Sequence, residues 1–173
     1  MPLPRIADLI APERILPNLK AANEQRVIAA LSRLVAAEAG ISELTVLLSM
    51  RATQRLTAFG VGRGVAIPHG VVSGLARPLG AFARLKTPLE FGAADGRPAD
   101  LVFLLAGAGA QPATLLPLLA RIARRLRDRE VLKHLRAGCS AEAIYAVLAT
   151  EAWRAQAGPP AVMNGSIRAK HPV

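Results

Sequence analysis

The chain has 173 residues, of which 52% are hydrophobic but only 3% aromatic, and it carries a net charge of +10. This length suffices for one domain with a full hydrophobic core, which aliphatic side chains and alanine must build. No apolar run reaches the roughly 20 residues that span a bilayer, the first residues lack a secretory signal, and Cys139 is the single cysteine. We therefore expect a cytoplasmic protein without membrane insertion.

The start of the chain is predicted to form a helical turn, a strand and a longer helix, in that order. Residues 6–10 have enough apolar side chains for one helical turn, and residues 14–19 suit a strand that Pro17 restricts to a sheet edge or a bulge. Asn23 and Gly40 have the properties of an N-cap and a C-terminal stop, so a longer helix is expected between them.

A second helix is expected to start after Ser42, which has a typical N-cap side chain. Its buried face is predicted to hold three leucines, Leu44, Leu47 and Leu48. A loop that carries Arg51 and Arg55 is expected to follow this helix and to lead into a glycine-rich segment.

Residues 59–70 place a histidine directly after a proline, in the sequence Phe-Gly-Val-Gly-Arg-Gly-Val-Ala-Ile-Pro-His-Gly. Glycine lets backbone amides approach a bound group, and Pro68 restricts its own φ and favours an extended residue before it. His69 is therefore expected at the end of a short strand over residues 65–67, beside backbone N–H donors. This arrangement suits a histidine that accepts and releases a phosphoryl group, although the spacing alone leaves a loop histidine without a task as an equal alternative.

Two nucleotide-binding readings of these glycines are disfavoured. A dinucleotide-binding turn requires a helix directly after the glycines, whereas this segment leads into an apparent strand that stops at Pro68. The Gly-x-x-x-x-Gly-Lys-Ser/Thr pattern of a triphosphate-binding loop is not found in the sequence.

Strands are predicted in the middle of the chain. Apolar alternation over residues 79–85, a short run over 89–91 and a continuous apolar run over 101–105 predict three strands, the last buried on both faces. Asp95-Gly96 is a turn signal between the second and the third.

Three helices are predicted to follow. The first has one apolar stripe, formed by Leu115, Leu118, Leu119, Ile122 and Leu126. The others are expected over residues 130–137 and, after a Ser140 cap, over residues 141–149.

These elements predict a three-layer α/β sandwich, in which a mixed sheet of about five strands has helices on both faces. A single domain is expected over residues 1–157. Residues 158–173 have no periodicity and are predicted to form a disordered tail.

Much of the positive charge lies between residues 121 and 136, on the polar side of the expected helices, as in a solvated face. Nucleic-acid binding is disfavoured because aromatic platforms for bases are nearly absent and no helix-turn-helix, zinc or RNA-binding signature accompanies the charge. An acidic or phosphorylated protein partner explains the charge at least as well.

The order of helices, glycine run, Pro-His pair, strands and final helices resembles the type-2 enzyme IIA domain of the bacterial sugar phosphotransferase system, and most of all its nitrogen-regulatory form. The matching segments are residues 60–70, 87–91, 95–98, 101–105 and 118–126, followed by Leu135-Arg136 and Ser140. The resemblance covers about residues 5–150, nearly the whole chain.

The resemblance implies that His69 is phosphorylated by a small histidine-containing carrier protein. Backbone amides near Gly70 and a cation such as Arg55 are candidates to neutralise the phosphoryl oxygens, with no cofactor and no metal required. In the nitrogen-regulatory branch the phosphorylation state is read by partner proteins, often linked to potassium transport, sensor kinases or nitrogen balance. Which imidazole nitrogen takes the phosphate depends on hydrogen bonds that the sequence does not define.

The sequence departs from this family at two positions. Leu115 stands where the family usually has a second histidine near the start of the long helix. Thr53, flanked by Arg51 and Arg55, stands where the family tends to have an arginine. We therefore expect phosphorylation of His69 to persist and onward transfer to be weakened or lost. The alternative is a non-catalytic interaction module that keeps the fold without phosphoryl turnover.

Overall fold

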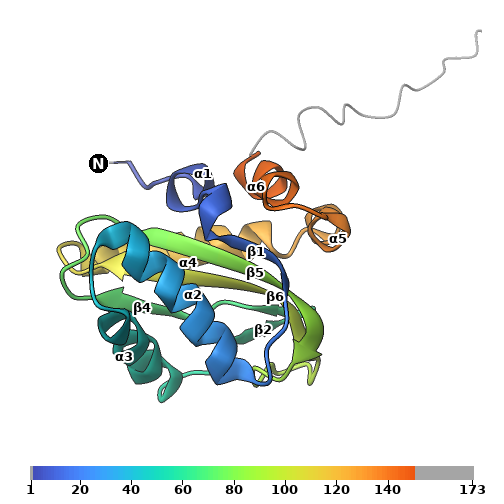
Figure 1. Ribbon diagram of the computed structural model, residues 1–173, viewed down its shortest axis with the longest axis horizontal. Helices are drawn as coiled ribbons and strands as arrows, with labels where there is room; N and C mark the ends of the chain where they lie inside the picture. The colour runs from blue at the N-terminus through green and yellow to red at the C-terminus, as the bar shows by residue number, and fades with distance from the viewer. Residues whose placement is uncertain (1, 151–173) are drawn as a thin grey trace, which may run out of the picture.

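A computed structural model describes residues 2–150 of the chain, which form one mixed sheet with helices on both faces. In chain order the elements are α1 (Ile6–Leu9), η1 (Pro12–Arg14), β1 (Ile15–Leu19), α2 (Glu24–Ala39), α3 (Glu43–Gln54), β2 (Gly60–Gly62), β3 (Val65–Ala66), β4 (His69–Val72), β5 (Leu79–Leu89), β6 (Ala99–Ala108), η2 (Pro112–Thr114), α4 (Leu115–Arg125), α5 (Arg129–Ala137) and α6 (Ala141–Ala149). Helices α2 and α3 cover one face, and α4 lies behind the sheet (Figure 1). The predicted three-layer sandwich is confirmed, with six strands where about five were expected.

The sheet is organised around β6. Its order is β1-β5-β6-β3-β2, and β4 pairs with β6 next to β3. Strands β3 and β4 both run parallel to β6, whereas β5 runs antiparallel to it. All ten residues of β6 except Asp100 are buried, as the continuous apolar run predicted. Strand β1 lies at an edge with a register shift between Leu16 and Leu19, so the effect expected of Pro17 is confirmed.

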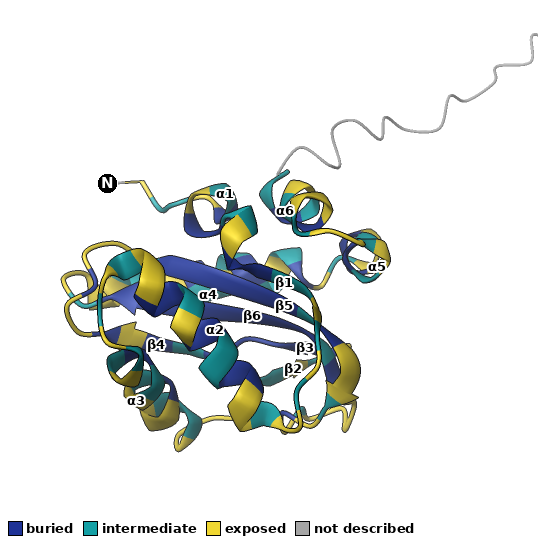
Figure 2. Ribbon diagram, in the orientation of Figure 1, coloured by how far each residue is buried: buried dark blue, intermediate teal, exposed yellow. Residues whose placement is uncertain are grey.

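Each face of the sheet has its own core (Figure 2). On one side, α2 and α3 pack through buried side chains such as Val27, Leu31 and Met50. On the other side, α1, α4, α5 and α6 pack through residues such as Leu118 and Ile144. Alternate residues of β6 contribute to the two cores, because successive side chains of a strand point to opposite faces.

The predicted helix ends are largely confirmed. The Asn23 side chain accepts a hydrogen bond from the amide of Arg26, and Gly40 ends α2 in the left-handed region at φ 67°. Ser140 caps α6 by accepting from the amide of Ala143 at 3.1 Å. Ser42 occupies the N-cap of α3 but makes no capping hydrogen bond with its side chain.

Two predictions of element bounds were wrong. Residues 79–85 belong to a longer strand, β5, which ends at Leu89 after a register shift, so the separate strand predicted over residues 89–91 is not formed. Arg51 lies inside α3 and Arg55 is its C-cap, so neither is in a loop. The predicted boundary at residue 157 and the predicted tail lie outside the described residues.

The predicted buried face of α3 was wrong for two of its three leucines. Val46 and Met50 are fully buried, whereas Leu44 is 60% and Leu48 is 55% exposed, and Leu47 is partly buried. The orientation of α3 is set by its close packing on β4, which brings Ser49 toward the sheet. Hydrophobicity along α3 alone does not reveal this contact.

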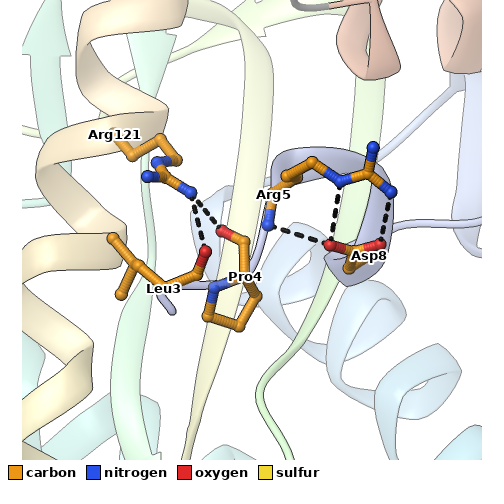
Figure 3. A network of polar contacts seen from close by, with 5 residues as sticks. All are labelled: Leu3, Pro4, Arg5, Asp8 and Arg121. Atoms are coloured by element: carbon orange, nitrogen blue, oxygen red, sulfur yellow. Dashed lines mark hydrogen bonds and ion pairs between the residues drawn. The ribbon is translucent and has the colours of Figure 1, made fainter. Parts of the chain in front are cut away.

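Arginine side chains tie distant segments together through backbone carbonyls. Arg121 donates to the carbonyls of Leu3 at 3.0 Å and Pro4 at 2.6 Å, fixing the N-terminal segment to α4 (Figure 3). Arg84 on β5 donates to the carbonyls of Pro17 and Arg136 in the same way. The expectation that the arginines between residues 121 and 136 form a solvated face is therefore wrong for those, such as Arg121, that satisfy backbone acceptors.

Candidate functional site

The glycine run forms a tight turn between β2 and β3, with three consecutive residues at positive φ: Gly62 at 90°, Arg63 at 59° and Gly64 at 76°. Arg63 is held there because its amide donates to Asp95 Oδ2 at 2.9 Å, and its carbonyl accepts from Arg136. The amides of Arg63 and Arg97 keep the pKa of Asp95 below its usual range. The turn is thus anchored to the loop before β6.

Pro68 separates two short strands, and His69 is the first residue of the second. The structure places His69 at the start of β4 rather than at the end of the preceding strand, which corrects the sequence prediction. The carbonyl of Pro68 still accepts from the amide of Leu105 at 2.8 Å, and His69 lies opposite Leu105 in the parallel pairing. Proline therefore interrupts one strand without releasing the chain from β6.

The imidazole of His69 is held by two contacts. Its Nδ1 lies 2.8 Å from the carbonyl oxygen of Ile67, and its ring meets the buried ring of Phe59 edge-on, with centroids 5.6 Å apart. A carbonyl oxygen only accepts hydrogen bonds, so this contact assigns the proton of the neutral imidazole to Nδ1. The lone pair is then on Nε2, and the ring is half-buried.

Gly70 allows helix α3 to approach β4. A Cβ at this position would overlap with Ser49 Oγ and lie 2.9 Å from the carbonyl oxygen of Ser49. Ser49 Oγ also donates to the carbonyl of Val71 at 2.7 Å. The residue after His69 is thus a glycine because a helix packs directly against it. Its proposed contact with phosphoryl oxygens stays a prediction.

Arg55, the predicted phosphate-binding cation, is exposed at the end of α3. Together with Arg51, Gln54 and Gln25 it lines an open hollow of about 380 Å³ between the end of α3 and the start of α2. Within residues 2–150, no hydrogen bond or ion pair joins Arg55 to His69. The phosphate-binding role of Arg55 stays a prediction.

Leu115 lies against β6, the strand that pairs with β4. A Cβ on Gly107 would meet Leu115 Cδ1 at 3.0 Å, and Gly107 lies opposite Val71, two residues after His69. The side chain beside this part of the sheet is therefore aliphatic and offers no hydrogen bond. Thr53, at the other departure from the family, directs its hydroxyl to the carbonyl of Ser49 at 3.4 Å.

Two exposed apolar side chains on the elements around His69 were missed by the sequence analysis. Val71 on β4 is 38% exposed, and Leu116, next to Leu115 at the start of α4, is 70% exposed. Leu116 occurs beside a helical stripe of leucines, so its direction depends on how α4 is rotated about its axis.

Two other kinds of site, a metal centre and a membrane span, have no candidate in residues 2–150. That part of the chain contains no group of three or more His, Cys, Asp or Glu residues arranged to hold a metal ion. Nor do its helices include one long and apolar enough to cross a membrane.

The family model and the related sequences that match this chain agree on one family. Residues 8–151 match the family "Phosphoenolpyruvate-dependent sugar phosphotransferase system, EIIA 2". The chain is 45% identical to a nitrogen regulatory protein of Bradyrhizobium diazoefficiens over 144 residues, covering 83% of this chain and 94% of that protein. It is 34% identical to a nitrogen regulatory protein of Pseudomonas aeruginosa, with the same shares covered.

Solved structures agree with this assignment. The nitrogen regulatory protein IIA-Ntr of Neisseria meningitidis is 29% identical and superposes with a TM-score of 0.77, covering 83% of this chain and 98% of that one. The mannitol IIA protein of Escherichia coli shares the fold, with a TM-score of 0.67 at 22% identity over 81% of this chain and 99% of that one.

Proposed function

The chain belongs to the EIIA type 2 family of the phosphoenolpyruvate-dependent sugar phosphotransferase system, in its nitrogen-regulatory branch. From this premise we propose that His69 accepts a phosphoryl group from a small histidine-containing carrier protein. The phosphorylation state of the chain then controls regulatory partner proteins in the bacterial cytosol. The observation that carries the proposal is the hydrogen bond from His69 Nδ1 to the carbonyl of Ile67, which leaves Nε2 free to react.

The transfer requires only positioning and charge stabilisation. Nε2 of His69 attacks the phosphorus, and an N–P bond forms as the N–P bond of the carrier's phosphohistidine breaks, with the electron pair returning to the carrier's imidazole. Nδ1 keeps its proton throughout, and the carbonyl of Ile67 stabilises the positive charge that develops on the ring. Pro68 and the contact with Phe59 limit the motion of the ring before the reaction.

Neutralisation of the phosphoryl oxygens falls to groups of this chain. We assign this role to the guanidinium of Arg55 and to backbone amides near Gly70, because cations and backbone N–H groups are the donors that phosphoryl oxygens require. Val71 and Leu116 provide exposed apolar surface on which a carrier protein can dock while His69 reacts.

Onward transfer is proposed to be slow in this chain. Leu115 provides no hydrogen-bond donor beside the strand that carries His69, so a phosphohistidine there lacks one possible contact that would steady it for departure. The same observation supports the second candidate function, in which the chain binds regulatory partners without phosphoryl turnover.

Intact-mass analysis after incubation with a phosphorylated histidine-carrier protein tests the proposal. We expect one acid-labile phosphate on the wild type and none on His69→Ala, with His134→Gln as the matched control because His134 bonds to its own helix. Two-dimensional NMR of the product is expected to show the phosphate on Nε2. A wild-type chain that takes no phosphate rejects the phosphoryl-accepting function and favours the interaction module.

A further inference from the structure

The outer face of α3 carries a stripe of four side chains that the fold does not use. Leu44, Leu48, Arg51 and Arg55 follow one another at spacings of four, three and four residues, which places them on one side of the helix. Val46 and Met50 face the core instead and are fully buried. The side of α3 turned away from the sheet contains exposed residues along its length (Figure 2). We call these four side chains the α3 stripe.

The apolar half of the stripe is unusual for a solvated helix. Leu44 and Leu48 are one turn apart and more than half exposed. Exposed leucines that occur singly require no explanation, but two adjacent ones on a helix form the kind of anchor that a partner helix packs against.

The other half of the stripe is cationic. Arg51 and Arg55 are exposed, and among residues 2–150 neither forms an ion pair or a side-chain hydrogen bond. Glu43, the acidic residue of α3, lies 3.4 Å from Arg33. The hollow that the two arginines line with Gln25 and Gln54 is open to solvent and has room for carboxylates.

We propose that the α3 stripe docks an amphipathic helix of a regulatory partner, with leucine-like residues against Leu44 and Leu48 and acidic residues against Arg51 and Arg55. This inference rests on the proposed function, because it describes the partner whose control that function requires. Charge complementarity selects an acidic helix.

Two other occupants fit the stripe less well. A second copy of α3 would bring only Glu43 as an acidic residue, and Glu43 already pairs with Arg33. Residues 151–173 contain Arg154, Arg168 and Lys170 but a single acidic residue, Glu151, so their charge has the wrong sign for the arginines.

The stripe is placed to respond to His69. Helix α3 packs on β4, the strand that begins with His69, through Gly70 and the hydrogen bond from Ser49 to Val71. A phosphoryl group on His69 adds about −2 charge to the strand on which α3 packs. The added repulsion is expected to weaken docking by roughly three- to tenfold at low ionic strength, and by less at high salt.

The first test uses a synthetic acidic helix as the probe. A fluorescein-labelled peptide of about five turns, with leucines at i and i+4 and glutamates at the neighbouring i+7 and i+11 positions, is titrated with the full chain and followed by anisotropy. We expect binding to fall at least tenfold in Leu44→Ser/Leu48→Ser and in Arg51→Glu/Arg55→Glu. The matched controls Leu56→Ser, at an 87% exposed leucine, and Arg129→Glu/Lys133→Glu on α5 should bind as the wild type does.

A charge swap and an association measurement complete the test. A peptide with lysines in place of the glutamates should bind Arg51→Glu/Arg55→Glu better than it binds the wild type. No binding of the acidic peptide, or equal binding by the leucine and control variants, overturns the inference. Self-association in sedimentation equilibrium that disappears in Leu44→Ser/Leu48→Ser would also overturn it, because a second copy is then the occupant.

The inference and the proposed function fail in distinguishable ways. Leu44→Ser/Leu48→Ser should still take one phosphate on His69, since these leucines are not assigned to the transfer. Phosphate on His69 without peptide binding rejects the α3 stripe alone, whereas peptide binding without phosphate rejects the transfer alone.

Discussion

Replacing Gly70 by alanine tests whether the contact between α3 and β4 holds His69 in place. Gly70 is not among the residues at positive φ, so alanine is compatible with the backbone and the cost is steric. The new methyl group would overlap with Ser49 Oγ and lie 2.9 Å from the carbonyl oxygen of Ser49. Moving α3 away costs about 1–3 kcal/mol for overpacking, and about 0.5–1.5 kcal/mol more if the Ser49–Val71 hydrogen bond is lost.

We therefore expect Gly70→Ala to lower the free energy of unfolding by about 2–3 kcal/mol in urea titrations, after the small entropic gain from alanine is subtracted. Its phosphorylation by the carrier should also slow. Ser49→Ala/Gly70→Ala should recover part of this loss, because the hydroxyl is removed but the carbonyl contact remains. Gly74→Ala is the control. No atom lies within 4 Å of the added Cβ, so the loss of stability comes only from the φ of 81° and amounts to about 1 kcal/mol. A Gly70→Ala variant with an unchanged midpoint and slope refutes the packing argument.

Three further variants test other parts of the structure. Leu115→His places a hydrogen-bond donor beside the paired strands β4 and β6, so it should speed the return of the phosphoryl group to the carrier in rapid-quench assays. An unchanged return rate would contradict the role given to Leu115. Burial raises the pKa of Glu24, although the hydrogen bond from Gln54 opposes this shift. The folded state therefore holds the proton more tightly than the unfolded state, and the protein loses stability as pH rises above about 4. Glu24→Gln should have a higher urea midpoint than the wild type at pH 7, and the difference should close at lower pH. The amides of Arg63 and Arg97 lower the pKa of Asp95, so the stability that this carboxylate contributes is present above its unfolded pKa of about 4 and lost as pH falls through the folded value. Asp95→Asn should unfold at a lower urea concentration than the wild type at pH 7. If the difference in urea midpoint stays constant down to pH 2, the carboxylate is not its cause.

Local signals in the sequence account for much of the fold. The apolar run that became β6, the Asn23 cap, the Gly40 stop and the bulge near Pro17 each depend on neighbouring residues. His69 was predicted as the reactive group from the Pro-His pair together with the family resemblance, and this role stays a prediction. The structure adds the contact with Ile67 that distinguishes the two ring nitrogens.

The wrong predictions depend on contacts between distant segments. The leucines of α3 were assigned to the core from their spacing, but the rotation of the helix follows from the meeting of Ser49 and Gly70, 21 positions apart in the sequence. Nothing local to Arg121 shows that it bonds to carbonyls of residues 3 and 4. Periodicity predicts that a helix has a buried side and does not define which neighbour covers it.

The arginine ties have a consequence for the order in which the chain assembles. The guanidinium of Arg121 and the carbonyl of Leu3 are 118 positions apart, and those of Arg84 and Pro17 are 67 apart. Closing a long loop costs entropy, so we expect the bond from Arg121 to form late, after α4 has packed on the sheet. Interactions absent from the folding transition state act on the unfolding rate rather than on the folding rate. We therefore expect the loss of the Arg121 guanidinium to raise the unfolding rate more than it lowers the folding rate.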